Sequence, residues 1–463
     1  MIKLPALPLL ALLCLAAPAQ AAPPAATAKD VAAAKTILMQ GVGFDTVKGR
    51  GKVPAYAAYL KSVLVAGGFA PGDISIEPVG ETANFHLVWK GSGKAPPMAI
   101  AAHMDVVEAN PKDWVRDPFT AIEDGGYLFG RGVGDNKFDL SMAAATLVAL
   151  KSKGFTPNRD IHLFISGDEE TDGVTAALQA KQAKAAGVDF LLNTDAGGGR
   201  LDESGKPAGY GLSAGEKTYA DYSLTVTNAG GHSSRPTRPN AIAQLGAVAG
   251  RIDSYRFAPQ INEITRASLA DAGGRVGGAL GAAMIGFART PADAAAIAVL
   301  RADPGASGQI ATTCVPTMIN GGHAPNALPQ RAVMLVNCRI FPGVTAETVR
   351  AELERVAADP AVKVTTGQEW ASTPPSPLRA DVVRAVGKAV GAAYPGVVPV
   401  PSMDSGASDS VFYRALGIPS YGVGGLFMKE SDVFIHGLNE RIPVAAIEPA
   451  LRHWQVLITE LAQ

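Results

Sequence analysis

Short apolar runs alternate with helical patterns along the first part of this chain. The apolar runs cover 98–102, 161–165 and 188–192, and helical patterns cover 55–66 and 138–151. This alternation is typical of βαβ units, in which parallel strands are buried on both faces. It predicts an α/β fold with a mostly parallel sheet and helices on both faces. In such sheets functional groups gather at the carboxyl ends of the strands.

A different rhythm begins near Lys217. Strands are predicted at 219–227, 310–319, 332–340 and 362–366, and helices at 239–252 and 345–357. The order β-α-β-β-α-β is the split pattern of ferredoxin-like α+β domains. The Ala-rich and Gly-rich stretch 253–307 interrupts this pattern, and the sequence assigns it no role.

These two rhythms predict the domain organisation. After a proline-rich boundary, Ser376-Pro377 predicts an N-cap and first residue for a helix over 378–393. We therefore predict a large domain in two parts, 22–215 and 373–463, with a small domain inserted at 216–372. A chain of 463 residues is long enough for two cores.

The N-terminus has the features of a secretory signal. Lys3 precedes an apolar run over 4–17, and small residues follow at Ala19 and Ala21. We predict a signal peptide at 1–21 and a periplasmic or secreted protein. The run is shorter than the ~20 residues of a membrane span, so no membrane association is expected after cleavage. The net charge of −1 provides no basic field that would attract nucleic acid.

Two cysteines follow the signal, Cys314 and Cys338. They flank a turn at 321–329 between two predicted strands, and antiparallel pairing about that turn brings them close to opposite positions. A disulfide is compatible with an oxidising compartment. Two buried free thiols fit the sequence at least as well. Neither cysteine has the Cys-x-x-Cys spacing of a metal site.

The first candidate for chemistry is His103, which follows the apolar run 98–102. A histidine at a strand end is more often structural than a metal ligand. Asp105, however, lies two residues on, and therefore on the same side of an extended chain. Its carboxylate can bind one imidazole nitrogen and leave the other free for a metal ion.

Two polar loops follow. The Gly-rich loop 130–134 leads to Asp135. A phosphate cradle and a plain turn are alternatives, but the Walker spacing is missing and Asp135 repels phosphate, so a cation site is favoured. The loop 166–173, after the run 161–165, contains Glu169 and Glu170 among four acids. A solvated turn is the alternative there, although clustered carboxylates at the end of a buried strand repel one another unless a cation or a shared proton relieves them.

Asp195, after the run 188–192, and His436, near the C-terminus, complete the set. Each signal is weak alone. Together, in order, spacing and context, they resemble the zinc metallopeptidase family of glutamate carboxypeptidase, succinyl-diaminopimelate desuccinylase, acetylornithine deacetylase and aminoacylase. The resemblance covers essentially the whole mature chain. The stretches 113–119 and 130–137 look most like those of the dipeptidase and acylase members.

The resemblance implies two zinc ions held by five side chains. One ion would be bound by His103 and Asp195, the other by Glu170 and His436, and both by Asp135. Mixed histidine and carboxylate ligands suit zinc, and the ligand types also admit cobalt or manganese.

The same resemblance implies the catalytic roles. Asp105 would be the hydrogen-bonding partner of His103, and Glu169 would be the general base. The peptide bond after Asp135 would be cis. The large domain would be catalytic, and the inserted domain would serve as a lid and dimerisation domain, which makes the protein a homodimer.

Substrate-binding residues are implied in the lid and beside it. His232 resembles the lid histidine that reaches a neighbouring active site and stabilises the oxyanion. Asn326 and Arg339 match positions that contact the substrate carboxylate, and a solvated strand residue is the alternative for Arg339. Gly406 lies in the predicted pocket loop, where Ser405 replaces the first glycine of the family motif and leaves the side-chain specificity open.

We therefore predict an exported di-zinc metallopeptidase that cleaves a peptide or N-acyl amide bond beside a free carboxylate. The 113–119 motif favours an exopeptidase of the dipeptidase or carboxypeptidase type, and an N-acyl-amino-acid deacylase is the alternative. A catalytically silent relative that binds peptides or amino acids is the rival from another class. Such relatives usually lose a ligand or the base, and this chain keeps all of them.

Overall fold

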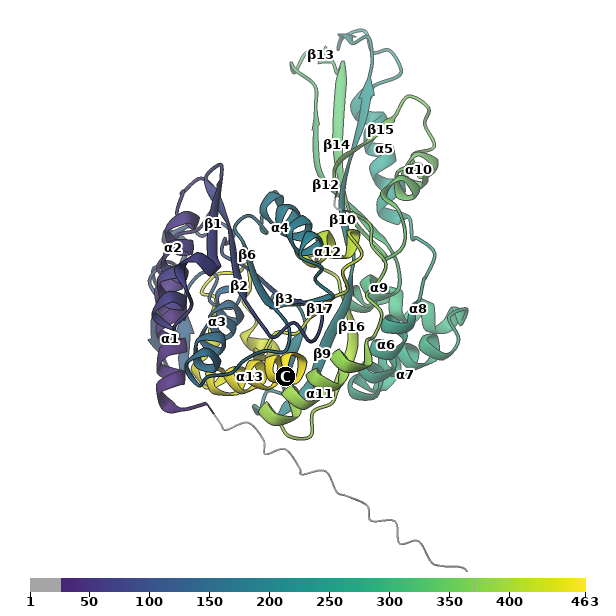
Figure 1. Cartoon of the computed structure of the whole chain (residues 1–463). Coiled ribbons are helices and arrows are strands. Elements are labelled where there is room, and N and C mark those ends of the chain that lie inside the picture. The colour runs from purple at the N-terminus through teal and green to yellow at the C-terminus, as the bar shows by residue number, and fades with distance from the viewer. Residues whose placement is uncertain (1–25, 370) are drawn as a thin grey trace, which may run out of the picture.

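The computed structural model describes residues 26–369 and 371–463 and contains two main sheets (Figure 1). The larger sheet runs β1-β2-β6-β3-β7-β17-β9-β8-β18, with β16 beside β9. Its strands are β1 (Ile74–Val79), β2 (Thr82–Trp89), β3 (Met98–His103), β6 (Ile161–Ser166), β7 (Phe190–Asn193), β8 (Gly198–Leu201), β9 (Pro207–Glu216), β16 (Pro399–Asp404), β17 (Ser420–Gly422) and β18 (Phe427–Lys429). The central strands β6, β3, β7 and β17 are parallel, which confirms the predicted fold class.

Helices cover both faces of this sheet because its central strands are apolar on both sides. In β3, Met98, Ile100 and Ala102 belong to one core, and Ala99 and Ala101 belong to another. The first core is completed by α1 (Ala28–Val42), α2 (Val53–Ala66), α3 (Lys137–Ser152), α11 (Ala380–Ala393) and α13 (Ile447–Ala462). The second is completed by α4 (Val174–Ala185) and α12 (Ser410–Ala415).

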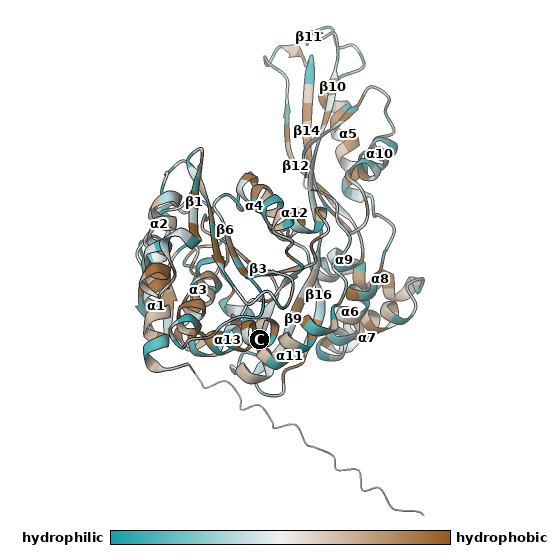
Figure 2. Cartoon of the chain, in the orientation of Figure 1, coloured by the Kyte–Doolittle hydropathy of each residue, from teal (hydrophilic) through white to brown (hydrophobic). Residues whose placement is uncertain are grey.

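The smaller sheet has the order β12-β14-β10-β15 and forms, with two helices, what we call the small domain (Figure 1). Its elements are β10 (Thr218–Thr227), α5 (Ala241–Ser254), β12 (Thr313–Gly321), β14 (Arg331–Ile340), α10 (Ala346–Ala357) and β15 (Lys363–Glu369). This is the predicted β-α-β-β-α-β order. Residues of β14 alternate between buried and less buried, and Figure 2 shows hydrophobic and hydrophilic residues side by side around α10. One face of each element therefore packs into a single core.

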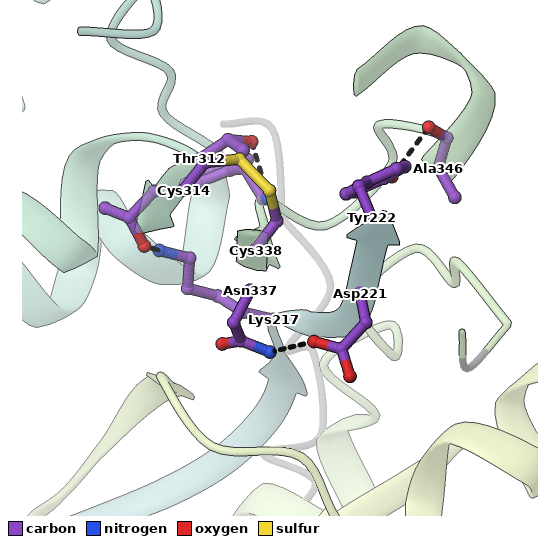
Figure 3. Close-up of a disulfide and its surroundings, with 10 residues drawn as sticks. Lys217, Asp221, Tyr222, Thr312, Cys314, Asn337, Cys338 and Ala346 are labelled. Carbon is purple, nitrogen blue, oxygen red and sulfur yellow. Dashed lines mark hydrogen bonds between the residues drawn. A yellow bond between two sulfur atoms is a disulfide. The ribbon is translucent and has the colours of Figure 1, made fainter. Parts of the chain in front are cut away.

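Cys314 and Cys338 form a disulfide between β12 and β14, where they occupy directly opposite positions (Figure 3). Of the two alternatives that the sequence left open, the structure therefore contains the disulfide. The bond lies near Lys217, the residue between β9 of the large sheet and β10 of the small domain.

The stretch that interrupts the ferredoxin-like pattern folds into helices with a core of their own. They are α6 (Glu263–Val276), α7 (Gly278–Arg289), α8 (Ala294–Ala302) and α9 (Pro304–Ile310). Helix α6 packs against β16 of the large sheet, so the insertion lies beside that sheet rather than on the small domain's sheet (Figure 1).

Shorter elements complete the chain. They are η1 (Pro71–Asp73), η2 (Pro111–Asp113), β4 (Ile122–Asp124), β5 (Tyr127–Phe129), β11 (Gly231–His232), β13 (Ala327–Leu328), η3 (Glu430–Asp432), β19 (Arg441–Pro443) and η4 (Val444–Ala446). The predicted signal peptide at 1–21 lies outside the described residues. Within the described ranges, no helix combines the length and apolar character needed to cross a bilayer.

One predicted helix start is wrong. Helix α11 begins at Ala380, and Ser376 is not its N-cap. The Ser376 hydroxyl instead donates to the Ser420 carbonyl at 2.8 Å and accepts from the Ser420 amide at 2.9 Å. This contact ties the segment before α11 to β17, so the tertiary hydrogen bonds replace the local cap.

Candidate metal centre

The five predicted ligands come from loops at one edge of the large sheet. His103 is the last residue of β3, Glu170 follows β6, and Asp195 follows β7. These three strands are parallel neighbours, so their carboxyl ends meet. Asp135 precedes α3, and His436 lies in the loop before β19.

Asp135 lies between the two histidines. Its Oδ1 is 2.9 Å from Nε2 of His103, and its Oδ2 is 3.3 Å from Nε2 of His436. Asp195 approaches the same His103 nitrogen at 3.6 Å, and Glu170 approaches the His436 nitrogen at 3.0 Å. The structure thus brings all five side chains together, with one carboxylate shared between two histidine–carboxylate pairs.

The donor atoms fit metal ions. One atom each from His103, Asp135 and Glu170 lie within 4.8 Å of one another, and so do atoms from His103, Glu169 and Asp195. Imidazole and carboxylate groups at this spacing are the donors that zinc and related divalent ions take.

The charges in the cluster are poorly balanced. Burial and the neighbouring Asp195 carboxylate raise the pKa of Glu169 well above its usual value, and burial and Asp135 do the same for Asp195. Burial lowers the pKa of His103, but the nearby Asp195, Asp105 and Asp135 carboxylates outweigh it and raise that pKa well above the usual value. Hydrogen bonds to Asp135 and Glu170 raise the pKa of His436 to about 10. A bound cation would relieve the carboxylates and displace these protons.

Asp105 holds the acidic turn in place. Its carboxylate accepts hydrogen bonds from the backbone N–H of Glu169 at 3.1 Å and of Glu170 at 3.0 Å. It lies 3.5 Å from Nδ1 of His103, while its own backbone carbonyl oxygen lies 3.1 Å from that nitrogen. Asp105 therefore orients both the histidine and the two adjacent glutamates.

The Asp135–Asn136 peptide bond is cis, as the resemblance implied. The Asn136 side-chain oxygen accepts from the backbone N–H of His103 at 3.3 Å and from the Thr194 hydroxyl at 2.7 Å. One amide thus connects the loops that carry Asp135, His103 and Asp195.

A buried ion pair that the sequence did not reveal joins the loops of Asp135 and His436. Glu440 accepts from Arg131 at 2.7 Å, from the N–H of Gly132 at 3.0 Å and from the N–H of Gly134 at 2.8 Å. Arg131 also donates to the carbonyl of Gly437 at 3.1 Å. The partners are more than three hundred residues apart in the chain, and no local pattern could have paired them.

The lid residues lie in two places. His232 and Asn326 are exposed at the tip of the small domain, where β11 pairs with β13 and the Ser233 amide donates to the Asn326 carbonyl at 3.0 Å. Figure 1 shows this tip far from the large sheet, so one chain does not bring these residues to the metal centre. Arg339 lies at the other end of β14, with its guanidinium carbon 4.9 Å from the centre of the Tyr219 ring. Gly406 is exposed in the loop after β16.

A cleft of about 580 Å³ opens from the cluster. Asp135 and Asp195 line it, and so does Ser405 of the predicted pocket loop. It continues along β8 and β18 to helix α6 of the insertion. A substrate bound at the cluster therefore has room on this side of the sheet.

The chain matches the family model described as peptidase family M20/M25/M40 over residues 99–460. The chain belongs to this family. It is accordingly a metal-dependent hydrolase that acts on amide bonds, and the predicted family is confirmed.

Individual relatives are distant in sequence. The N-fatty-acyl-amino acid synthase/hydrolase PM20D1.1 of Danio rerio is 28% identical over 391 residues, which cover 82% of this chain and 75% of that protein. An M20 family metallo-carboxypeptidase of Sulfolobus solfataricus has the same fold, with a TM-score of 0.70 at 19% identity over 92% of this chain and 98% of that one. The YXEP protein of Bacillus subtilis, described as a dinuclear metal-binding peptidase of this M20 family, aligns with a TM-score of 0.58 at 14% identity, covering 94% of this chain and 99% of that one.

Proposed function

We propose that this M20 hydrolase is an exported di-zinc exopeptidase that cleaves a peptide or N-acyl amide bond beside a free carboxylate. The observation that carries the proposal is the position of Asp135, whose two oxygens face two different histidines at 2.9 and 3.3 Å. A carboxylate placed in this way suits a pair of adjacent ions rather than one. The Bacillus subtilis relative is described as dinuclear, which supports two metal ions here as well.

Five side chains would hold the two ions. His103 and Asp195 face one position, and His436 and Glu170 face the other, with Asp135 common to both. When bound, a pair of such ions polarises the scissile carbonyl and lowers the pKa of water toward ~7. Zinc is favoured by the mixed imidazole and carboxylate donors.

Glu169 is the proposed general base. It is buried beside His103 and Asp195 without being needed as one of the five ligands, and Asp105 holds its backbone in place. Its raised pKa suits a carboxylate that takes a proton from the attacking water and returns it to the leaving amine. The chain retains all five ligand candidates and Glu169, which disfavours a catalytically silent binding protein.

Arg339 is the proposed contact for the substrate carboxylate. Its guanidinium packs on Tyr219 and can bind a carboxylate in a bidentate manner. His232 and Asn326 lie too far from the cluster of their own chain to take part there (Figure 1), so we propose a homodimer in which each tip reaches the site of the other subunit.

The substrate type has two candidates. The Danio rerio relative is named for fatty-acyl amino acids and the Sulfolobus protein for carboxypeptidase activity. The motif at 113–119 favours peptides, and the apolar side chains of Val433 and Ile435 in the cleft wall favour an N-acyl chain as the alternative. Export through the predicted signal would suit the use of peptides or acyl amino acids from outside the cell.

One experiment tests the proposal. The purified mature chain is analysed for metal content and screened against dipeptides and N-acyl amino acids, with and without chelator. We expect two zinc ions per chain and chelator-sensitive hydrolysis. Arg339→Ala should raise KM roughly 10-fold or more for substrates with a free carboxylate, the effect of a lost charge-assisted hydrogen bond, and should change little for amidated substrates. One ion per chain, or equal loss on amidated substrates, would contradict the respective part of the proposal.

A further inference from the structure

The end of the cleft that lies away from the metal centre is built by the insertion. From Asp195, the cleft passes over Gly197–Gly199 and reaches Arg200 of β8. Its outer wall there is helix α6, which contributes Asp271 and Arg275. The segment to which the sequence assigned no role therefore forms part of the same cavity as two candidate metal ligands.

Two guanidinium groups meet at this end. A Cβ atom added to Gly209 would lie 3.7 Å from Nη2 of Arg200 and 3.8 Å from Nε of Arg275. The two arginines therefore approach the same point from two elements that are distant in sequence. Partial burial and the charge of Arg275 lower the pKa of Arg200. The nearby carboxylates of Asp271 and Glu430 oppose this shift. Two cations that approach one point attract an anion there more strongly than either does alone.

The two arginines differ in their partners. Arg275 is fixed by Asp271, which accepts from its Nε at 2.9 Å and its Nη2 at 2.7 Å. The Arg200 side chain makes no hydrogen bond or close ion pair with any residue in the described ranges, although the Asp271 and Glu430 carboxylates lie near enough to raise its pKa. The guanidinium of Arg200 is therefore free to bind a ligand, and Arg275 is held ready beside it.

We propose that Arg200 and Arg275 bind a second carboxylate of the substrate, at the end opposite the one that Arg339 binds. This inference rests on the proposed function and defines its substrate class as acyl amino acids or peptides with an anionic group on the acyl side. Four residues lie between Asp195 and Arg200, so the two Cα atoms are at most ~17 Å apart even for fully extended chain. This value is an upper limit on the length of the linker between the two groups.

The cleft walls between the two ends suit such a linker. Met403, Leu426 and Met428 line the cavity, and the run Gly197–Gly199 leaves its floor without bulky side chains. At Gly199 a Cβ atom would come within 2.2 Å of the Phe427 ring, so glycine is required there for packing. An aliphatic chain that ends in a carboxylate matches apolar walls that end in arginines.

The test compares two substrates that differ in one group, N-octanedioyl-phenylalanine and N-octanoyl-phenylalanine. For the zinc-loaded chain we expect kcat/KM to be about 10-fold or more higher for the octanedioyl compound, as for a charge-assisted hydrogen bond. Arg200→Gln should lower this ratio to near one, Arg275→Gln should lower it in part, and Arg200→Lys should restore part of it. Arg289→Gln, on α7 outside the cleft, should leave the ratio unchanged.

Binding without turnover separates the two proposals. Calorimetry with the metal-depleted full chain should show that Arg200→Gln weakens the octanedioyl ligand about 10-fold and the octanoyl ligand little. If neither compound is hydrolysed but this difference appears, the proposed reaction is wrong and the subsite stands. If both compounds are hydrolysed with the same kcat/KM, or if Arg200→Gln leaves the ratio intact, the subsite is wrong and the reaction stands.

Discussion

The two halves of the metal centre use similar side chains on very different supports. His103 ends a central strand, its side chain is 1% exposed, and its backbone is bound by Asn136. His436 lies in a loop with a positive φ of 62°, and its side chain is 51% exposed. The inner half, around His103, is therefore fixed by the fold. The outer half, around His436, faces solvent and depends on the contacts of one loop. We therefore expect the two halves to differ in their affinity for a metal ion.

The largest effect should come from a residue of the inner half that binds no ion in our proposal. Glu169→Ala should lower kcat by roughly 10²–10⁴-fold, because it removes the proton acceptor, while metal analysis still finds two ions. Asp172→Asn, an exposed acid of the same turn that pairs with Lys48, is the matched control and should keep its activity. An active Glu169→Ala enzyme, or one that has lost an ion, would assign this residue a different role.

Ligand removal should distinguish the halves directly. His436→Ala should weaken one ion by more than the ~10–100-fold typical of a lost supporting contact and leave the inner ion bound. His103→Ala should weaken both, because His103 also positions Asp135. Each variant is titrated with a chelator and its metal content is measured, which gives the affinity for each ion. His323→Ala, at an exposed turn, is the control. Loss of both ions from His436→Ala would show that the halves are not separable.

A smaller effect should follow from the ion pair between the two loops. Glu440→Gln keeps the shape of the side chain and weakens its bonds to Arg131 and the Gly132 amide. We expect metal affinity to fall roughly 10–100-fold at the outer position and less at the inner one. Glu448→Gln is the control, because the half-buried Glu448 pairs with Arg452 away from the two loops, and it should change neither affinity. Equal losses at both positions would mean that Glu440 acts through Asp135 alone.

Metal binding at the outer position should also respond to pH. With a pKa of about 10, His436 is protonated in the metal-free chain at neutral pH and must lose that proton to bind an ion. Affinity at the outer position should therefore rise as pH rises from 6 to 8, by about 10-fold per unit for each proton released. Calorimetry in two buffers of different ionisation enthalpy counts the protons. A pH-independent affinity would contradict the proton displacement.

Much of the fold could be predicted because its signals are local, whereas the set of five ligands followed from the family resemblance. The strand runs, the polar residues that follow them and the small domain's element order all occur within short windows of sequence. His103 and Asp195 come together because β3 and β7 are parallel neighbours. The alternating pattern predicts a mostly parallel sheet but not this order of its strands.

What the sequence could not show depends on contacts between distant segments. The Arg131–Glu440 pair joins two loops that no local rule connects. Ser376 has the features of a helix cap, but its hydroxyl bonds to Ser420 instead. The insertion has an ordinary helical composition, and only its packing against β16 makes α6 a wall of the cleft.

The junction between the two domains restricts how they can move. A single residue, Lys217, separates β9 from β10, and its ammonium group donates to the carbonyl of Gly308 at 3.0 Å and to the hydroxyl of Thr313 at 3.2 Å. Lys217 carries the chain into the small domain, and the segment 308–313 leads from the insertion into β12. These two crossings between the domains are thus bonded to each other. A rotation of the small domain about the line through these crossings would keep both hydrogen bonds, whereas a shift along the sheet would break them. Opening and closing over a substrate would then follow one arc.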